Sequence, residues 1–122
     1  MISLPTSASI FLYSQPTDMR KSFCGLSGIV RSELGREPND GSLFLFINRR
    51  KDRLKALYWE TDGMILFYKL LESGTFERME SGGRPAVKID AAELSMLLSG
   101  IDIQSARRRK RFRRADRQEH GP

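Results

Sequence analysis

Three apolar runs separated by two polar turns stand in residues 43–71, LFLFINRRKDRLKALYWETDGMILFYKLL. The first run, Leu43–Asn48, is continuous and rich in aromatic residues, which suits a central strand. Leu54–Glu60 and Met64–Leu71 are the second and third, and Thr61-Asp62-Gly63 separates them. Aspartate followed by glycine between strand-like runs is typical of a tight hairpin turn. This region therefore predicts three antiparallel strands joined by two hairpins.

Shorter strand signals lie on both sides of this region. Ile10–Ser14 (IFLYS) precedes it and Ala86–Ile89 (AVKI) follows it, and each predicts one short strand. Thr75–Met79 is a weaker candidate for a further strand. The sheet is therefore expected to hold about four to six strands.

Two helices are predicted, one on each side of the strand-rich region. Pro16-Thr17-Asp18 is typical of a helix start, with Thr17 or Asp18 as N-cap, and Gly35 is a natural C-cap. The second helix follows Asp90, whose spacing to Glu93 fits a capping box. Apolar residues recur every three or four positions in both segments, at Met19, Phe23, Leu26, Val30 and Leu34 and at Leu94, Leu97, Leu98 and Ile101.

These elements predict an α+β fold in a single domain spanning residues 1–103. We expect an antiparallel sheet of about four to six strands, with the two helices on one face. Residues 104–122 form a separate basic, flexible C-terminal tail, which we expect to be disordered, or helical only when bound.

All of the formal net charge sits in that tail. Residues 104–122 hold eight cations against two anions, which accounts for the whole +6. The preceding 103 residues hold the other 13 of 21 cations and 13 of 15 anions, so they are neutral. Dense cations release condensed counterions when they meet nucleic acid, so the tail points to a polyanion. The cations predicted to bind nucleic acid there are Arg107, Arg108, Arg109, Lys110, Arg111, Arg113 and Arg114.

The sequence gives little support for catalysis. The single histidine, His120, stands near the end of the tail, and Cys24 has no histidine partner and is predicted to be a small, partly buried thiol. No Cys/His set has metal-ligand spacing, and no glycine-rich phosphate loop follows a strand. We therefore predict a protein that is not an enzyme and that has no cofactor and no metal site.

We expect no targeting signal either. The apolar runs are far shorter than the ~20 residues needed to span a bilayer, so no membrane partner is expected. The N-terminus has no basic region before its apolar residues, and one cysteine cannot form an internal disulfide. The expected location is the cytoplasm, with association with the nucleoid as an open alternative.

Two basic clusters stand out within the neutral domain. Arg20 and Lys21 are predicted to lie in the opening turn of the first helix, where cations oppose the helix dipole. Two interpretations stay open for them: they receive a phosphate together with free backbone N–H groups, or they pair with carboxylates such as Asp18.

The second cluster is at the first hairpin turn and comprises Arg49, Arg50, Lys51, Arg53 and Lys55. It is either a solvated turn or a surface for nucleic acid, with phosphates on the cations and bases on the neighbouring aromatic rings. Tyr58 and Trp59 follow on the same strand, and strand alternation places them on opposite faces. The sequence leaves the exposure of Trp59 undecided.

The assembled motifs resemble those of a bacterial insertion-sequence family. The resemblance covers residues 2–103 and lies in Thr17–Phe23 with Gly25-Leu26, Leu43–Phe46, Arg49–Lys55, Tyr58-Trp59, Asp62-Gly63, Phe67–Lys69, Leu71–Phe76, Ala92–Leu98 and Gly100–Asp102. The family is the Orf2-like accessory proteins, called TnpB, of the insertion-sequence-sixty-six group. It is distinct from the RNA-guided nuclease that shares the name TnpB.

The resemblance implies a companion protein of transposition. In such elements the DDE-type transposase is a separate, larger product, and the family supplies no catalytic residues to carry over. The leading hypothesis is a non-catalytic accessory protein that binds transposon-end DNA through Arg20, Lys21 and the hairpin cluster. The alternative is an assembly module that binds the transposase or other products of the same element through an apolar and aromatic sheet face. A third interpretation, a metal-dependent nuclease using Asp52 or Asp62, has the least support.

Overall fold

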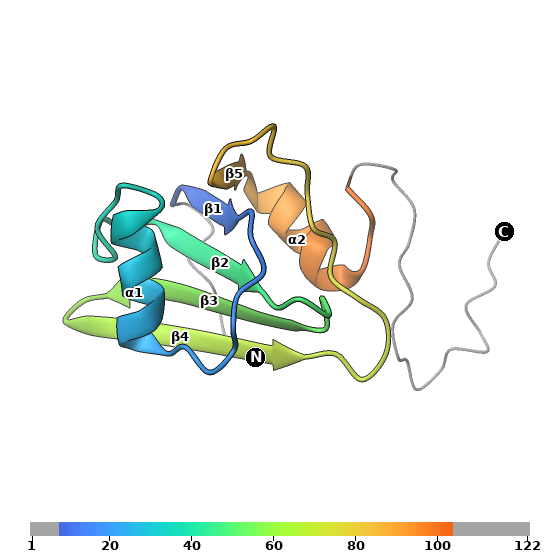
Figure 1. The fold of residues 1–122 in the computed structure, drawn as a ribbon, viewed down its shortest axis with the longest axis horizontal. Coiled ribbons are helices and arrows are strands. Elements are labelled where there is room, and N and C mark those ends of the chain that lie inside the picture. Colours follow the sequence, from blue (N-terminus) through green and yellow to red (C-terminus); the bar gives the residue numbers. More distant parts are fainter. Residues whose placement is uncertain (1–7, 104–122) are drawn as a thin grey trace, which may run out of the picture.

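The structure is a computed structural model and describes residues 8–103. It contains one five-stranded sheet and two helices (Figure 1). The elements in chain order are β1 (Ile10–Tyr13), α1 (Phe23–Ser32), β2 (Leu43–Ile47), β3 (Arg53–Glu60), β4 (Gly63–Leu70), β5 (Ala86–Ile89) and α2 (Ala91–Ser99). The predicted α+β class and the strand number are confirmed.

The sheet is mixed rather than wholly antiparallel. Its strand order is β4-β3-β2-β1-β5, and the two predicted hairpins, β2–β3 and β3–β4, are antiparallel. β5 also pairs antiparallel with β1, but β1 pairs parallel with β2, with Ile10 opposite Leu43. The parallel pair arises because helix α1 carries the chain back to the end of the sheet where β1 began. Residues 75–79 form no strand within the described part of the chain.

The two helices lie on opposite faces of the sheet, so their predicted placement on one face is wrong. On the first face, Leu26 and Val30 of α1 join a core cluster with Phe44 and Phe46 of β2. On the other face, α2 contributes to the second cluster, whose members include Leu45, Ile47, Leu94 and Leu97. Because both faces are covered, all five residues of β2 are buried.

Helix α1 begins later than the sequence predicts, at Phe23 instead of directly after Thr17 or Asp18. Its N-cap, Ser22, makes no side-chain capping bond. The Asp18 side chain accepts a hydrogen bond from the backbone N–H of Arg20, which closes a local turn before the helix. Residues 14–22 therefore form a long irregular connection between β1 and α1, with a turn at residues 19–20.

The predicted capping box of α2 is confirmed. The Asp90 carboxylate accepts a hydrogen bond from the Glu93 N–H at 2.8 Å, and the Glu93 carboxylate accepts one from the Asp90 N–H at 2.9 Å. Gly100 ends the helix in the left-handed conformation, with φ of 83°. Across residues 8–103, neither helix has the length and apolar character that a membrane crossing requires.

Candidate nucleic-acid interface

Residues 14–22, called the crossing segment below, pass over the face of the sheet that α1 covers (Figure 1). The Thr17 N–H donates to the carbonyl oxygen of Ile47 at the end of β2, at 2.9 Å. From β3, the ammonium of Lys55 donates to the carbonyl oxygens of Met19 at 2.8 Å and Lys21 at 2.7 Å. These bonds attach the crossing segment to two strands.

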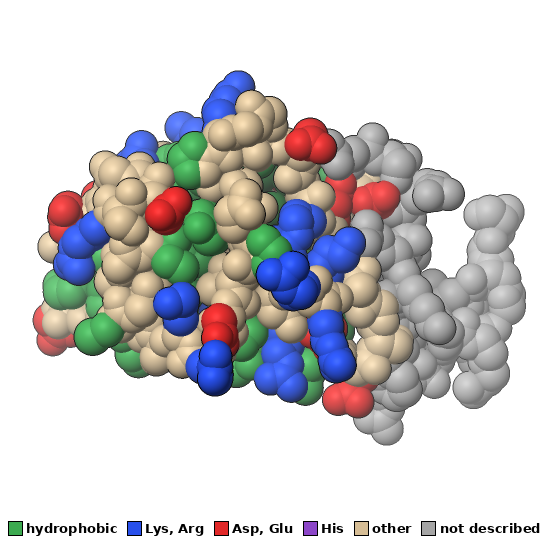
Figure 2. All heavy atoms as spheres, in the orientation of Figure 1, with side chains coloured by type: hydrophobic (Ala, Val, Ile, Leu, Met, Phe, Trp, Pro, Cys, Tyr) green, Lys and Arg blue, Asp and Glu red, His purple; other side chains and the backbone are tan. Residues whose placement is uncertain are grey.

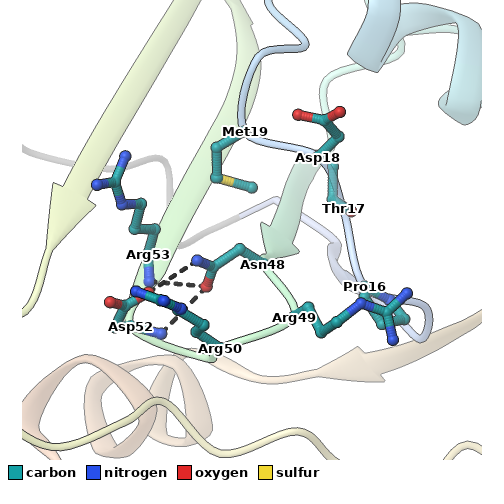
Figure 3. A pocket seen from close by; sticks show the side chains of 9 residues that line it. All are labelled: Pro16, Thr17, Asp18, Met19, Asn48, Arg49, Arg50, Asp52 and Arg53. Atoms are coloured by element: carbon teal, nitrogen blue, oxygen red, sulfur yellow. Dashed lines mark hydrogen bonds between the residues drawn. The ribbon is translucent and has the colours of Figure 1, made fainter.

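Residues 48–53, called the basic turn below, connect β2 to β3. Asn48 organises the turn from within: its Oδ1 accepts from the N–H groups of Asp52 at 3.1 Å and Arg53 at 2.9 Å. Its Nδ2 donates to the Asp52 carboxylate at 2.7 Å (Figure 3). Lys51 adopts the left-handed conformation, with φ of 64°, which reverses the chain.

The segment after β4 holds the same turn from its other side. The Leu71 N–H donates to the Asp52 carbonyl at 2.8 Å, and the Phe76 N–H donates to the Lys51 carbonyl at 2.6 Å. Arg78 donates from Nη2 to the Asn48 carbonyl at 2.6 Å. No sequence motif pointed to Arg78. Burial is the main cause that lowers its pKa, and nearby Arg49 lowers it further. The main chain of the basic turn is therefore fixed before any ligand arrives.

A groove of about 530 Å³ lies between the crossing segment and the basic turn. Figure 3 shows Arg49 on the Pro16 side of this groove and Arg53 on the opposite side. In Figure 2, Lys and Arg side chains gather at the end of the molecule where the β2–β3 turn lies. The lining residues are Pro16, Thr17, Asp18, Met19, Asn48, Arg49, Arg50, Asp52 and Arg53.

The cations of the basic turn are available to an external anion. Arg49, Arg50 and Arg53 are exposed, and Lys51 is half-buried. Within residues 8–103 the salt bridges pair Arg20 with Asp18, Arg31 with Glu37 and Arg36 with Asp40, so none of them uses the turn. The four cations among residues 49–53, three of them exposed, therefore have no carboxylate partner in the described part of the chain.

Lys55 was predicted to be a DNA contact at the surface, but the structure buries it. Its side chain lies under the crossing segment and is 6% exposed. Its ammonium already donates to two carbonyl oxygens and lies 4.6 Å from the centroid of the Tyr68 ring. The Lys55 ammonium is therefore occupied by contacts within the protein.

Arg20 and Lys21 lie just before α1, and not in its first turn as was predicted for them. Arg20 pairs with a carboxylate, which was one of the two interpretations left open: its guanidinium donates to both Asp18 oxygens, at 2.7–3.1 Å. The Arg20 side chain is still 91% exposed. Lys21 is exposed, and its stem lies against Gly25, where an added Cβ would be 3.0 Å from the Lys21 Cβ.

The Arg20–Asp18 pair gives a pH-dependent prediction. Hydrogen bonds from Arg20 lower the pKa of Asp18 from its usual 3.8 to about 2. A lowered pKa means that this pair stabilises the folded chain above pH ~4 and that the contribution disappears as the pH falls towards 2. Arg20→Gln is expected to raise the Asp18 midpoint part of the way towards 3.8, as followed by carboxyl ¹³C NMR, because the bond from the backbone N–H of residue 20 remains. An unchanged midpoint would show that the turn, and not the guanidinium, lowers the pKa of Asp18.

The aromatic residue beside the basic turn is Tyr68 of β4. Tyr58 is buried at 5% exposure, and Trp59, although exposed, is opposite Met64 at the far end of β3 from the turn. Tyr68 is opposite Lys55, and its hydroxyl oxygen accepts a hydrogen bond from Arg53 Nη1 at 3.0 Å. The two-residue turn between Glu60 and Gly63 sets this register. The position of Tyr68 opposite Lys55 could therefore have been deduced from the predicted Asp62-Gly63 hairpin.

The remaining predicted chemical groups do not assemble into a site. Cys24 is exposed, and not partly buried, because it stands near the solvent-facing start of α1. Asp52 and Asp62 lie at opposite ends of β3, eight residues long. Over residues 8–103, no three His, Cys, Asp or Glu side chains gather where they could hold a metal ion. The tail cations and His120 lie outside the described residues.

The chain matches a known class of transposition proteins along most of its length. Residues 8–108 match the family described as IS66 Orf2 like protein, so the chain belongs to this family. It is therefore a transposition-associated accessory protein. The match takes in residues 104–108, and so extends five residues beyond the predicted domain limit, into Arg107 and Arg108.

Two proteins of Sinorhizobium fredii are similar to the chain along most of their length. The uncharacterized protein y4jC is 36% identical over 111 residues, which cover 89% of this chain and 92% of the relative. The uncharacterized protein y4hO is 36% identical over 102 residues, covering 84% and 88%. No solved structure matches the chain.

Proposed function

We propose that this accessory protein binds the DNA of its own transposable element through the basic turn. The observation that carries the proposal is the set of exposed guanidinium groups on a turn whose main chain is held from both sides. A guanidinium presents its donors in a planar fork that matches a phosphate, so Arg49, Arg50 and Arg53 suit the DNA backbone.

The fixed main chain favours binding because little conformational entropy remains to be lost there. Hydrogen bonds that the Asn48 side chain accepts, and others that Leu71, Phe76 and Arg78 donate, already hold the turn. Association costs less free energy when the contacting residues are ordered beforehand. The positive charge is also local, because residues 1–103 hold equal numbers of cations and anions.

The other predicted cations have supporting roles in this proposal. Arg20 and Lys21 are exposed on the crossing segment and lie beside the groove, whereas Lys55 holds that segment in place. Arg107–Arg111, Arg113 and Arg114 add affinity through further phosphates. Phosphate contacts position a protein on DNA without reading its sequence.

Neutralising the basic turn is expected to make DNA binding less dependent on salt. The triple variant Arg49→Gln, Arg50→Gln, Arg53→Gln removes three phosphate contacts. The slope of log K against log salt should therefore become less steep by roughly 2–3 units. Fluorescence anisotropy with a labelled element-end duplex, titrated at several salt concentrations, gives this slope.

A second triple variant controls for the loss of net charge. Lys69→Gln, Arg84→Gln and Lys88→Gln remove three cations that lie outside the groove, and none of them takes part in a salt bridge within residues 8–103. This variant is expected to keep most of the wild-type slope. Equal losses in the two variants would overturn the basic turn as a contact, and absence of DNA binding by the full chain would overturn the function itself.

A second candidate function is assembly with the transposase. It is favoured by the exposure of three large apolar side chains, Phe23, Trp59 and Leu70. A pull-down of the transposase that survives nuclease treatment and high salt would support this role. An association that salt and nuclease abolish would instead be one mediated by DNA.

A further inference from the structure

Tyr68 is held in one orientation while almost half of its surface stays exposed. The ammonium of Lys55 lies 4.6 Å from the centroid of its ring. Arg53 donates to its hydroxyl oxygen at 3.0 Å. The side chain is nevertheless 47% exposed. A surface tyrosine held at two points has a ring whose direction is set before any ligand binds.

The surroundings of this ring combine positive charge with apolar surface. Arg53 is at the start of β3 and Leu70 is opposite it on β4, with Leu70 50% exposed. The Lys55 ammonium that faces Tyr68 also bonds to the Lys21 carbonyl, which places the exposed Lys21 close to the same ring. The Tyr68 ring is therefore linked to the basic turn through Arg53 and to the crossing segment through Lys55.

We infer that Tyr68 stacks on an unpaired base, so the DNA that the basic turn holds is single-stranded or carries an unpaired base at this point. In a duplex each base is covered on both faces by its neighbours, so a side chain stacks only on a base outside the helix. Cations beside aromatic rings are the combination by which proteins bind single strands without reading the sequence. The inference rests on the proposed DNA binding, because Arg53 serves both.

The test compares single-stranded and duplex DNA of the same sequence and length. Tyr68→Leu removes the ring and keeps an apolar side chain at an exposed position. In anisotropy titrations of the full chain, its affinity for a 20-nucleotide single strand is expected to fall about ten-fold, the order expected for loss of one stacked base. Its affinity for the duplex should stay within about two-fold of the unmodified chain.

Two further variants separate stacking from a structural role. Tyr68→Phe keeps the ring and loses only the bond from Arg53, so it should retain most of the single-strand affinity. Trp59→Leu removes the exposed aromatic ring at the far end of β3 and should change neither affinity. Equal losses on both DNA forms, or no loss on either with Tyr68→Leu, would overturn the stacking role.

A crosslinking experiment on the unmodified chain does not depend on the folding of a variant. A single strand that carries 5-iododeoxyuridine is irradiated with the protein, and the crosslinked residue is located by mass spectrometry. A crosslink at Tyr68 is expected, and crosslinks confined to Trp59 or to other residues would overturn the inference. If the basic-turn triple variant loses duplex binding while Tyr68→Leu behaves as the unmodified chain, the proposed function stands and only the stacking role fails.

Discussion

Lys55→Met is expected to lower the free energy of unfolding by about 2 kcal/mol, because it leaves two carbonyl oxygens without their donor. The carbonyls of Met19 and Lys21 both accept from the Lys55 ammonium, and methionine keeps the length of the stem without any donor. The contact of the cation with the Tyr68 ring is lost as well. Removal of one partner from a buried charged hydrogen bond is costly because the other partner stays desolvated.

The effect should be local as well as global. The melting temperature is expected to fall by roughly 8–12 °C for a domain of this size. Hydrogen exchange at residues 18–22 should accelerate more than exchange in the sheet, because this stretch loses its bonds from Lys55. Residue 17 should be less affected, because Thr17 would remain bonded to Ile47. Lys69→Met is the matched control, since Lys69 is on the adjacent strand and its ammonium forms no salt bridge within residues 8–103. Equal melting temperatures for the two variants would contradict the role of Lys55.

Substitution of five tail cations by glutamine is expected to remove the largest part of the salt dependence of DNA binding. Arg109, Lys110, Arg111, Arg113 and Arg114 lie beyond residue 108, where the family match ends. If all five reach phosphates, the slope of log K against log salt should become less steep by about 4–5 units. The change exceeds that expected for the basic turn because more phosphates are involved.

The measurement uses the same labelled duplex and salt series as the basic-turn variants. Thermal unfolding of the substituted chain should match the unmodified chain, which would show that the domain is intact. The tail and basic-turn substitutions should add in the slope, because each removes its own phosphate contacts. A slope that stays within one unit of the wild-type value would contradict tail binding to DNA.

The strands could be predicted because their signals are local. The run LFLFI of β2 is apolar throughout, and the Asp62-Gly63 turn fixes the β3–β4 hairpin. A continuous apolar run is typical of a strand covered on both faces, and the prediction of both helices on one face did not use this signal. The parallel β1–β2 pair was missed, although a strand, a helix and a strand in succession favour it.

The start of α1 was predicted wrongly because one signal serves two structures. An aspartate side chain that accepts a backbone N–H two residues later occurs both at an N-cap and in an isolated turn. In this chain the bond from the Arg20 N–H to Asp18 closes an isolated turn, and the helix begins five residues after Asp18. The crossing segment, and with it one wall of the groove, depends on this difference.

The site was only partly predictable, because charge is visible in sequence and burial is not. Arg49, Arg50 and Arg53 were identified from their density and are exposed in the fold. Lys55 belongs to the same run, but strand alternation and the overlying crossing segment bury it. Tyr68 is 15 residues from Arg53 in the sequence, so only the strand register brings the two together.

The bonds that hold the basic turn use main-chain atoms of residues 48–53 and the side chains of Asn48, Asp52 and Arg78. Arg49 and Arg50 contribute no side-chain bond to the fold within the described residues. A change at either position should therefore alter DNA affinity without a cost in stability, whereas Lys51 is restricted by its left-handed backbone. Under the proposed function, substitutions at these two positions would tune the strength of DNA binding on an unchanged scaffold, without changing which sequence is bound.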